Sequence, residues 1–250
     1  MLHTVGYEQT VSNAAPTAIT PIPDPTVAVI GNDIRVPGAL PNIAGVIGMI
    51  NSAAATLRAQ IVTPSLRAVL PLDVSPIVNG LIQGTGYPRM LRLWSSPVPL
   101  IGLEPMDLLI QNAAAVLNRG FVWLCDGPVK PTTGKIYSVR WTATASLVTA
   151  SWVNSGAITF ASTLPTGHYQ VVGMRSWSAN QVAARIFFVG YPWRPGVPAG
   201  SAEDNTEDPF FRFGNLGVWG EFDNTVPPTI DFMGITDTAE AGQFDLIKVS

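Results

Sequence analysis

The feature that most constrains this fold is a regular alternation of apolar and polar residues in the second half of the chain. In Ile136–Thr144, apolar residues that include Val139 and Trp141 occupy every second position. Successive side chains of a β-strand point to opposite faces, so a period of two is typical of a strand. The segment therefore predicts a strand with one face in a core and the other toward solvent.

Short runs of similar character occur along much of the chain. They are rich in β-branched and aromatic residues and are separated by Gly, Pro, Asn and Ser, which favour turns. The runs are Leu57–Val62, Leu66–Val74, Met106–Gln111, Gly120–Cys125, Leu147–Val153, Ala157–Ala161, Tyr169–Trp177, Ala183–Val189, Thr229–Ile235 and Gln243–Val249. Successive strands without helical periodicity predict a mainly β protein, an antiparallel sandwich or barrel.

The first 41 residues differ from the rest in being rich in Ala, Thr and Pro. Such sequence favours extended backbone and does not make a core alone. We therefore expect an extended arm at 1–41 that becomes ordered against a neighbouring subunit, and one β-sandwich domain at 42–250. The alternative divides 42–250 into two small β-barrels. The small residues of Asn42–Ala55, with Asn42 as N-cap, predict a short helix.

The composition is unusual for a free monomer. Charged residues make up 12% of the chain, against about 25% in an ordinary soluble domain. Lysine occurs three times and arginine eleven times, and protein interfaces are enriched in Arg and depleted in Lys. The composition therefore predicts a surface that is largely buried against neighbours. A compositional bias of the source genome is the alternative explanation.

Charge and hydropathy argue against two kinds of partner. The net charge is −3 and there is no basic run, whereas nucleic-acid binding needs clustered Lys and Arg, so we expect no direct nucleic-acid contact. Val36–Leu57 contains no ionisable residue, but Pro37 and Pro41 interrupt its start. What remains is shorter than the roughly 20 residues of a membrane-spanning helix. We therefore expect no transmembrane span.

A search for catalytic and cofactor motifs predicts a protein that is not an enzyme. His3 and His168 lie far apart and Cys125 has no second cysteine, so no zinc site is expected. No phosphate-binding loop and no nucleophile elbow is present. His168 is the plausible base, but no acid stands near it in the sequence. We expect no catalytic residue, no cofactor and no metal.

The segment Gly190–Asn215 has little periodicity and predicts an extended surface loop. Its Trp and Arg are suited to act as contact anchors, because these residue types dominate binding energy at interfaces. Its acidic residues lack the spacing of a calcium loop, which favours a solvated or inter-subunit role. The predicted interface residues are Trp193, Arg194, Glu203, Asp204, Glu207 and Asp208.

The segment Leu164–Gly196, LPTGHYQVVGMRSWSANQVAARIFFVGYPWRPG, combines strands and turns in a chain that also has a Pro-rich arm. In these features the C-terminal half resembles the small jelly-roll capsid proteins of tailless icosahedral phages. The resemblance implies a jelly-roll-like, eight-stranded antiparallel β-sandwich that acts as a self-assembling shell subunit. It implies copies of itself and other shell proteins as partners. It also implies a place in the virion, after assembly in the host cytoplasm.

A second function stays open at this point: a monomeric, lectin-like module that binds carbohydrate or a surface. Such a module uses exposed aromatic side chains. The candidates are Trp123, Trp141, Trp152, Trp177, Trp193 and Trp219. We favour core or interface positions for them, because Trp141 lies on the apolar face of its predicted strand.

Overall fold

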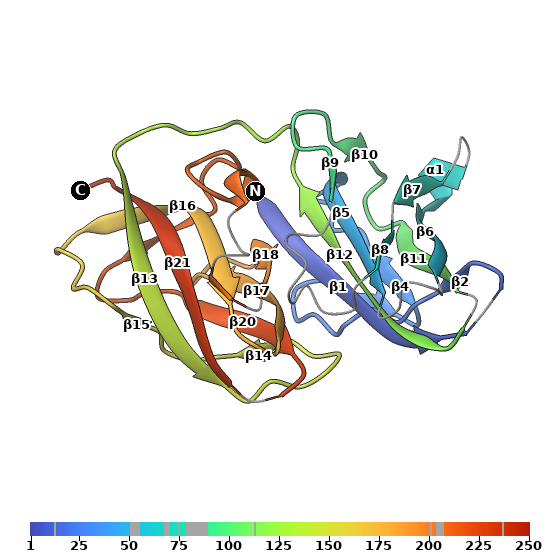
Figure 1. The fold of residues 1–250 in the computed structure, drawn as a ribbon. Helices are drawn as coiled ribbons and strands as arrows, with labels where there is room; N and C mark the ends of the chain where they lie inside the picture. Colours follow the sequence, from blue (N-terminus) through green and yellow to red (C-terminus); the bar gives the residue numbers. More distant parts are fainter. Residues whose placement is uncertain are drawn as a thin grey trace. The chain divides into compact units, whose positions relative to one another are not determined.

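The computed structural model is mainly β, with 51% of residues in strands and 3% in helices (Figure 1). This confirms the predicted class. The structure describes residues 1–12, 14–50, 56–67, 71–74, 76–78, 90–112, 114–200, 202–203, 208–236 and 238–250. Within these ranges no helix is long and apolar enough to cross a membrane.

The chain divides into two compact units, each with its own pair of sheets. The N-terminal unit consists of Leu2–Leu81 and Pro88–Pro128, and the C-terminal unit is built mainly from Val129–Ser250. The division therefore does not fall at Pro41. Residues 42–250 are not one sandwich, because the first part of this range shares its sheets with residues 2–41.

The N-terminal unit contains two six-stranded sheets. One has the order β1-β12-β5-β10, with β8 and β9 also paired to β5; the other has the order β3-β4-β11-β6-β7, with β2 also paired to β11. The elements are β1 (Leu2–Val11), β2 (Thr17–Ala18), β3 (Val29–Ile30), β4 (Asp33–Arg35), β5 (Asn42–Ile50), β6 (Thr56–Val62), α1 (Pro64–Arg67), β7 (Leu72–Val74), β8 (Pro76–Val78), β9 (Leu91–Arg92), β10 (Val98–Pro99), β11 (Pro105–Asn112) and β12 (Val116–Cys125).

Strand β1 corrects the prediction of a separate arm. Its ten residues pair antiparallel with β12, from Leu2 opposite Cys125 to Val11 opposite Val116. The Tyr7 side chain is buried and its hydroxyl donates to the carbonyl of Met106 at 2.9 Å, which joins the two sheets. The proline-rich composition of 1–41 concealed this strand, because the prolines lie after it.

Strand β5 corrects the prediction of a helix at Asn42–Ala55. It lies between β12 and the short strands β8, β9 and β10, and Val46 and Ile47 on it are buried. A strand that is buried on both faces reads as a continuous apolar run, which periodicity alone does not distinguish from a buried helix. Residues 51–55 lie outside the described ranges.

The C-terminal unit has a five-stranded and a four-stranded sheet. Their orders are β15-β13-β21-β16-β19 and β14-β20-β17-β18. The elements are β13 (Ile136–Ala145), β14 (Val153–Asn154), β15 (Thr159–Phe160), β16 (His168–Trp177), β17 (Gln181–Phe187), β18 (Gly196–Pro198), the 3₁₀ helix η2 (Pro209–Phe211), β19 (Gly220–Asp223), β20 (Thr229–Gly234) and β21 (Thr238–Lys248).

Alternation along β13 builds the core of the C-terminal unit as predicted. Val139 and Trp141 are buried, and the Trp141 ring lies 6.0 Å from the ring of Phe232 on the facing sheet. Gly242 stands opposite Trp141 on β21. A Cβ at Gly242 would lie 2.1 Å from the indole, so only glycine leaves space for this tryptophan.

The two units share one strand order. Numbering eight principal strands of each unit in chain order gives sheets 1-8-3-6 and 2-7-4-5 in both. In the N-terminal unit the eight strands are β1, β4, β5, β6, β7, β10, β11 and β12, and in the C-terminal unit they are β13, β14, β16, β17, β18, β19, β20 and β21. The two units therefore have the same strand order, which no repeat in the sequence indicates.

Candidate interaction surface

The segment 190–215, which we call the strap, is partly built into the C-terminal unit. Its residues 196–198 form β18, with Val197 opposite Ala184 on β17. The chain from Pro195 to Gly200 is buried, and η2 follows further along. The prediction of an extended surface loop is therefore wrong for the middle of the strap.

Arg194, one of the two predicted contact anchors, is engaged within its own unit. Its guanidinium pairs with the carboxylate of Asp231 and lies 4.6 Å from the ring of Phe187. Asp231 also accepts a hydrogen bond from Arg185 Nε at 3.0 Å. The Arg194 side chain is 15% exposed, so its first role is to stabilise the sandwich. Trp193, the other predicted anchor, is half-buried.

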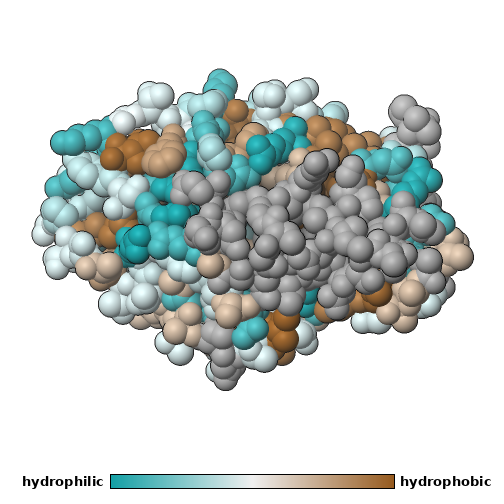
Figure 2. Space-filling model, viewed as in Figure 1, coloured by the Kyte–Doolittle hydropathy of each residue, from teal (hydrophilic) through white to brown (hydrophobic). Residues whose placement is uncertain are grey.

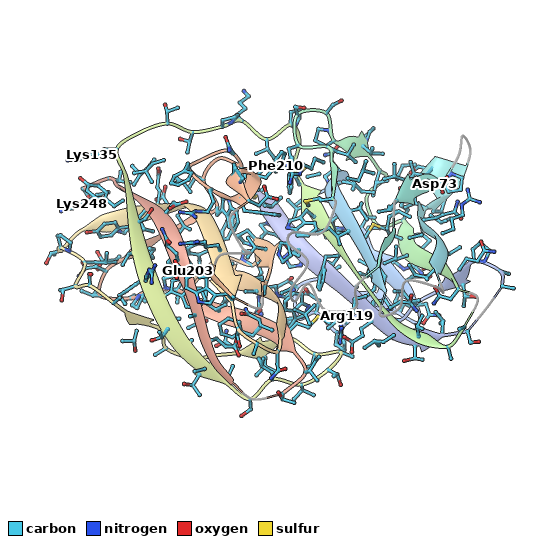
Figure 3. The ribbon with its side chains drawn as sticks, viewed as in Figure 1. Asp73, Arg119, Lys135, Glu203, Phe210 and Lys248 are labelled. Carbon is cyan, nitrogen blue, oxygen red and sulfur yellow. The ribbon has the colours of Figure 1, made fainter. Side chains whose placement is uncertain are left out.

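Glu203 holds the strap to the outer face of the five-stranded sheet (Figure 3). One of its oxygens, Oε1, accepts hydrogen bonds from Arg140 at 2.5 Å and from Arg175 at 2.8 Å. These arginines come from β13 and β16, the two neighbours of β21. The predicted interface residue is thus placed in an intramolecular ion-pair cluster that is open to solvent.

The end of the strap is attached by a second arginine–carboxylate pair, which is buried. Arg212 donates to both oxygens of Asp245, at 2.6 and 3.0 Å, and both side chains are buried. Asp208 caps η2 by accepting from the amide of Phe210 at 2.9 Å. Gly173 lets the strap approach the sheet, since a Cβ there would lie 2.9 Å from Arg212 Cα. The other two predicted residues, Asp204 and Glu207, lie outside the described residues.

A slot runs beside β19, an edge strand of the five-stranded sheet. Two adjoining hollows of about 410 and 300 Å³ share Val189 and Glu221 in their walls. Val189 is 71% exposed, and Val218 and Val226 are also exposed. An edge strand beside a slot with both apolar and charged residues in its walls is a place where another extended chain can pair. No sequence pattern indicates this slot, because segments distant along the chain build it.

His168 lies at the end of this slot and is paired with a carboxylate. Its Nδ1 is 3.5 Å from Asp223, and both side chains are largely exposed. Hydrogen bonds from the hydroxyl and the amide of Thr225, and a weaker one from His168, hold the pKa of Asp223 below its usual value. An exposed pair of this kind contributes little to stability. The structure thus places an acid, Asp223 of β19, beside His168, which the neighbouring sequence does not.

The N-terminal unit presents a rigid apolar turn. Ile101 is exposed and Leu103 is 73% exposed, with a left-handed φ of 69°. The buried Glu104 fixes the turn by accepting hydrogen bonds from the Ile101 amide at 2.8 Å and the Ser65 hydroxyl at 2.6 Å. Burial alone would raise the pKa of Glu104, but these and further hydrogen bonds outweigh it and lower the pKa. The turn therefore holds the apolar side chains of Ile101 and Leu103 exposed to solvent.

Searches of protein-family models, of curated proteins and of solved structures gave no match to this chain. Among the described residues, no group of three or more His, Cys, Asp or Glu side chains is arranged to hold a metal ion.

Proposed function

We propose that this protein is a structural subunit of a virus or phage shell, which acts by associating with its own copies and with other shell proteins. The observation that carries the proposal is the strand order 1-8-3-6 and 2-7-4-5, which occurs in both units. This is the order produced when an eight-stranded chain forms two Greek keys, the jelly roll. We propose that each unit is a jelly roll, an architecture used by viral capsid proteins.

The surface supports a role in association. Leu103 and Val189 are among the large apolar side chains left exposed, and charged residues are scarce. Figure 2 shows apolar residues at the surface beside polar ones on the face in view. Ile101 and Leu103 lie together on one hydrogen-bonded turn, and an exposed apolar group of this kind is typical of contact sites in assemblies.

The lectin-like alternative has less support. Jelly rolls also occur in lectins, so the fold alone does not choose between the two functions. No tryptophan in the described residues is fully exposed: four are buried and three are half-buried. Two of the half-buried ones, Trp152 and Trp177, lie against arginine side chains. An exposed tryptophan platform for a sugar ring is therefore lacking in the part of the chain described, where Tyr137 and Phe213 are exposed aromatic residues.

Under this proposal the chain carries no catalytic step, binds no nucleic acid directly, and functions in the virion after assembly in the host cytoplasm. Sedimentation velocity of the full chain tests it, over a range of concentrations and with the native partner proteins. We expect concentration-dependent conversion from small to large species. A protein that stays monomeric under all these conditions would support the binding-module alternative instead.

A further inference from the structure

Three arginine–carboxylate clusters attach segments of the C-terminal unit, and one differs from the other two. The Arg212–Asp245 and Arg185–Asp231 pairs are buried on both sides. The cluster of Arg140, Arg175 and Glu203 is open: Arg140 is 59% exposed and Glu203 is 33% exposed. An accessible pair can exchange its partner, whereas a sealed pair is held by its surroundings.

The register of three strands creates this open cluster. Gln243 on β21 stands opposite Arg140 on β13 and opposite Arg175 on β16. Residues that are directly opposite on neighbouring strands share a face of the sheet. Arg140, Gln243 and Arg175 therefore form a row across the outer face. The row is built from the sheet alone and needs no residue of the strap.

Arg175 is fixed by contacts that do not involve Glu203. Gln243 Oε1 accepts from Arg175 Nε at 3.0 Å and from its Nη2 at 2.6 Å. The guanidinium also lies 5.1 Å from the ring centroid of Trp177, a distance that allows a cation–π interaction. The Arg175 guanidinium is thus held in place by the sheet itself, independently of any bound anion.

Two positive charges meet at a single carboxylate oxygen in this cluster, since Glu203 Oε1 bonds to both arginines. Like charges at such close range repel each other unless an anion lies between them. Arginine is well suited to the oxygens of carboxylate and phosphate groups. Glu203 reaches the row from the strap, so it occupies this position as an anionic group from outside the sheet.

We propose that Arg140, Arg175 and Gln243 form an oxyanion-binding site that Glu203 occupies within the same chain. A carboxylate or phosphate group from another molecule takes the position of the Glu203 carboxylate when Glu203 is displaced. This site is independent of the slot beside β19 and of the proposed shell function.

The test is a calorimetric titration of the full chain at low ionic strength with inorganic phosphate and, separately, with acetate. Glu203→Ala vacates the site, and we expect it to bind at least one of the two anions about tenfold more tightly than the unmodified chain does. Acetate binding would identify carboxylates as ligands, and a gain confined to phosphate would identify phosphate groups. Glu203→Gln, which keeps the side-chain size, should give a smaller gain of the same sign.

Two variants control this experiment. Glu221→Ala removes an exposed carboxylate from β19 of the same sheet and should not increase anion binding. Arg175→Gln combined with Glu203→Ala should abolish the gain, while the circular dichroism spectrum stays that of the folded chain. Equal affinities in Glu203→Ala and Glu221→Ala, or a gain that survives the loss of Arg175, would overturn the proposal.

Discussion

The turn at 101–104 and the strap at 190–215 are both connections, but the two units fix them by different chemistry. Glu104 holds the turn through neutral donors, including the Ser65 hydroxyl and the Ile101 amide. The strap is held by charge pairs, Glu203 with two arginines and Arg212 with Asp245. The turn therefore depends on a carboxylate that faces neutral donors, whereas the strap depends on carboxylates that face arginines.

Charge pairs recur through the C-terminal unit, and the N-terminal unit has a buried pair of its own between Arg119 and Glu8. All five arginines of Val129–Ser250 pair with carboxylates of the same unit. A buried charge that loses its partner costs more free energy than a neutral group that loses a hydrogen bond. We therefore expect the loss of one partner of a buried pair, such as Arg212–Asp245, to cost more than the loss of one neutral hydrogen bond in the turn.

The largest effect is expected at Asp245. Its replacement by Ala leaves the buried Arg212 without its bidentate partner and should lower the free energy of unfolding by about 3–5 kcal/mol. Replacing the pair together, by Asp245→Leu with Arg212→Met, should recover much of this loss. Denaturant unfolding measures both. A loss below about 1 kcal/mol for Asp245→Ala would show that the pair is not the main attachment of the strap.

Substitutions at two glycines compare how easily the cores of the two units accommodate an added methyl group. A Cβ at Gly242 would meet the Trp141 ring at 2.1 Å and the Arg175 carbonyl at 2.6 Å, while a Cβ at Gly120 would meet mainly the end of the Leu108 side chain at 2.0 Å. Since a leucine end can rotate away, we expect Gly242→Ala to cost about 3 kcal/mol and Gly120→Ala about 1 kcal/mol. Equal losses in denaturant unfolding would contradict this difference in rigidity.

The sequence predicts strands of two kinds correctly: those with one buried face, such as β13, and those buried on both faces, such as β12 and β20. Alternation located β13, and the runs at Tyr169–Trp177 and Thr229–Ile235 correspond closely to β16 and β20. The prediction failed at Leu147–Val153, where only Val153 is in a strand and Ala150 has a left-handed φ of 52°. A local turn there overrides the apolar composition.

The candidate site was less predictable than the fold, because it depends on register. No sequence spacing brings Arg140, Arg175 and Gln243 together, since each lies on a different strand. A surplus of arginine over lysine is typical of interfaces. In the C-terminal unit, however, the arginines form intramolecular pairs. The scarcity of charge still favours a buried surface, whereas the surplus of arginine in this unit does not.

A pH titration tests the attachment of the turn by Glu104. The folded-state pKa of Glu104 is lowered, so its contribution to stability is complete above the unfolded pKa and is lost as the pH falls through the folded one. Glu104→Gln should cost about 2 kcal/mol at neutral pH and reduce the acid dependence. Hydrogen exchange should locate this loss in the N-terminal unit. An unchanged acid dependence would exclude Glu104 as the group responsible.

The smallest effects are expected at the two predicted contact anchors. Arg194→Ala should lower the free energy of unfolding by about 1.5 kcal/mol, because it removes a charged hydrogen bond to Asp231. Trp193→Ala should change stability less and reduce the size of assemblies seen in sedimentation. The opposite pattern would contradict these roles. In that case the Trp193→Ala variant assembles normally, whereas the Arg194→Ala variant keeps its stability and fails to assemble.

Negative-stain electron microscopy of native material that contains this protein tests the central claim, that the chain is a shell subunit, most directly. An antibody raised against the folded chain, applied to the same grids, identifies the particles to which the protein belongs. The account predicts labelled, closed particles of uniform size. Dispersed label, with no particle that carries it, would contradict the account.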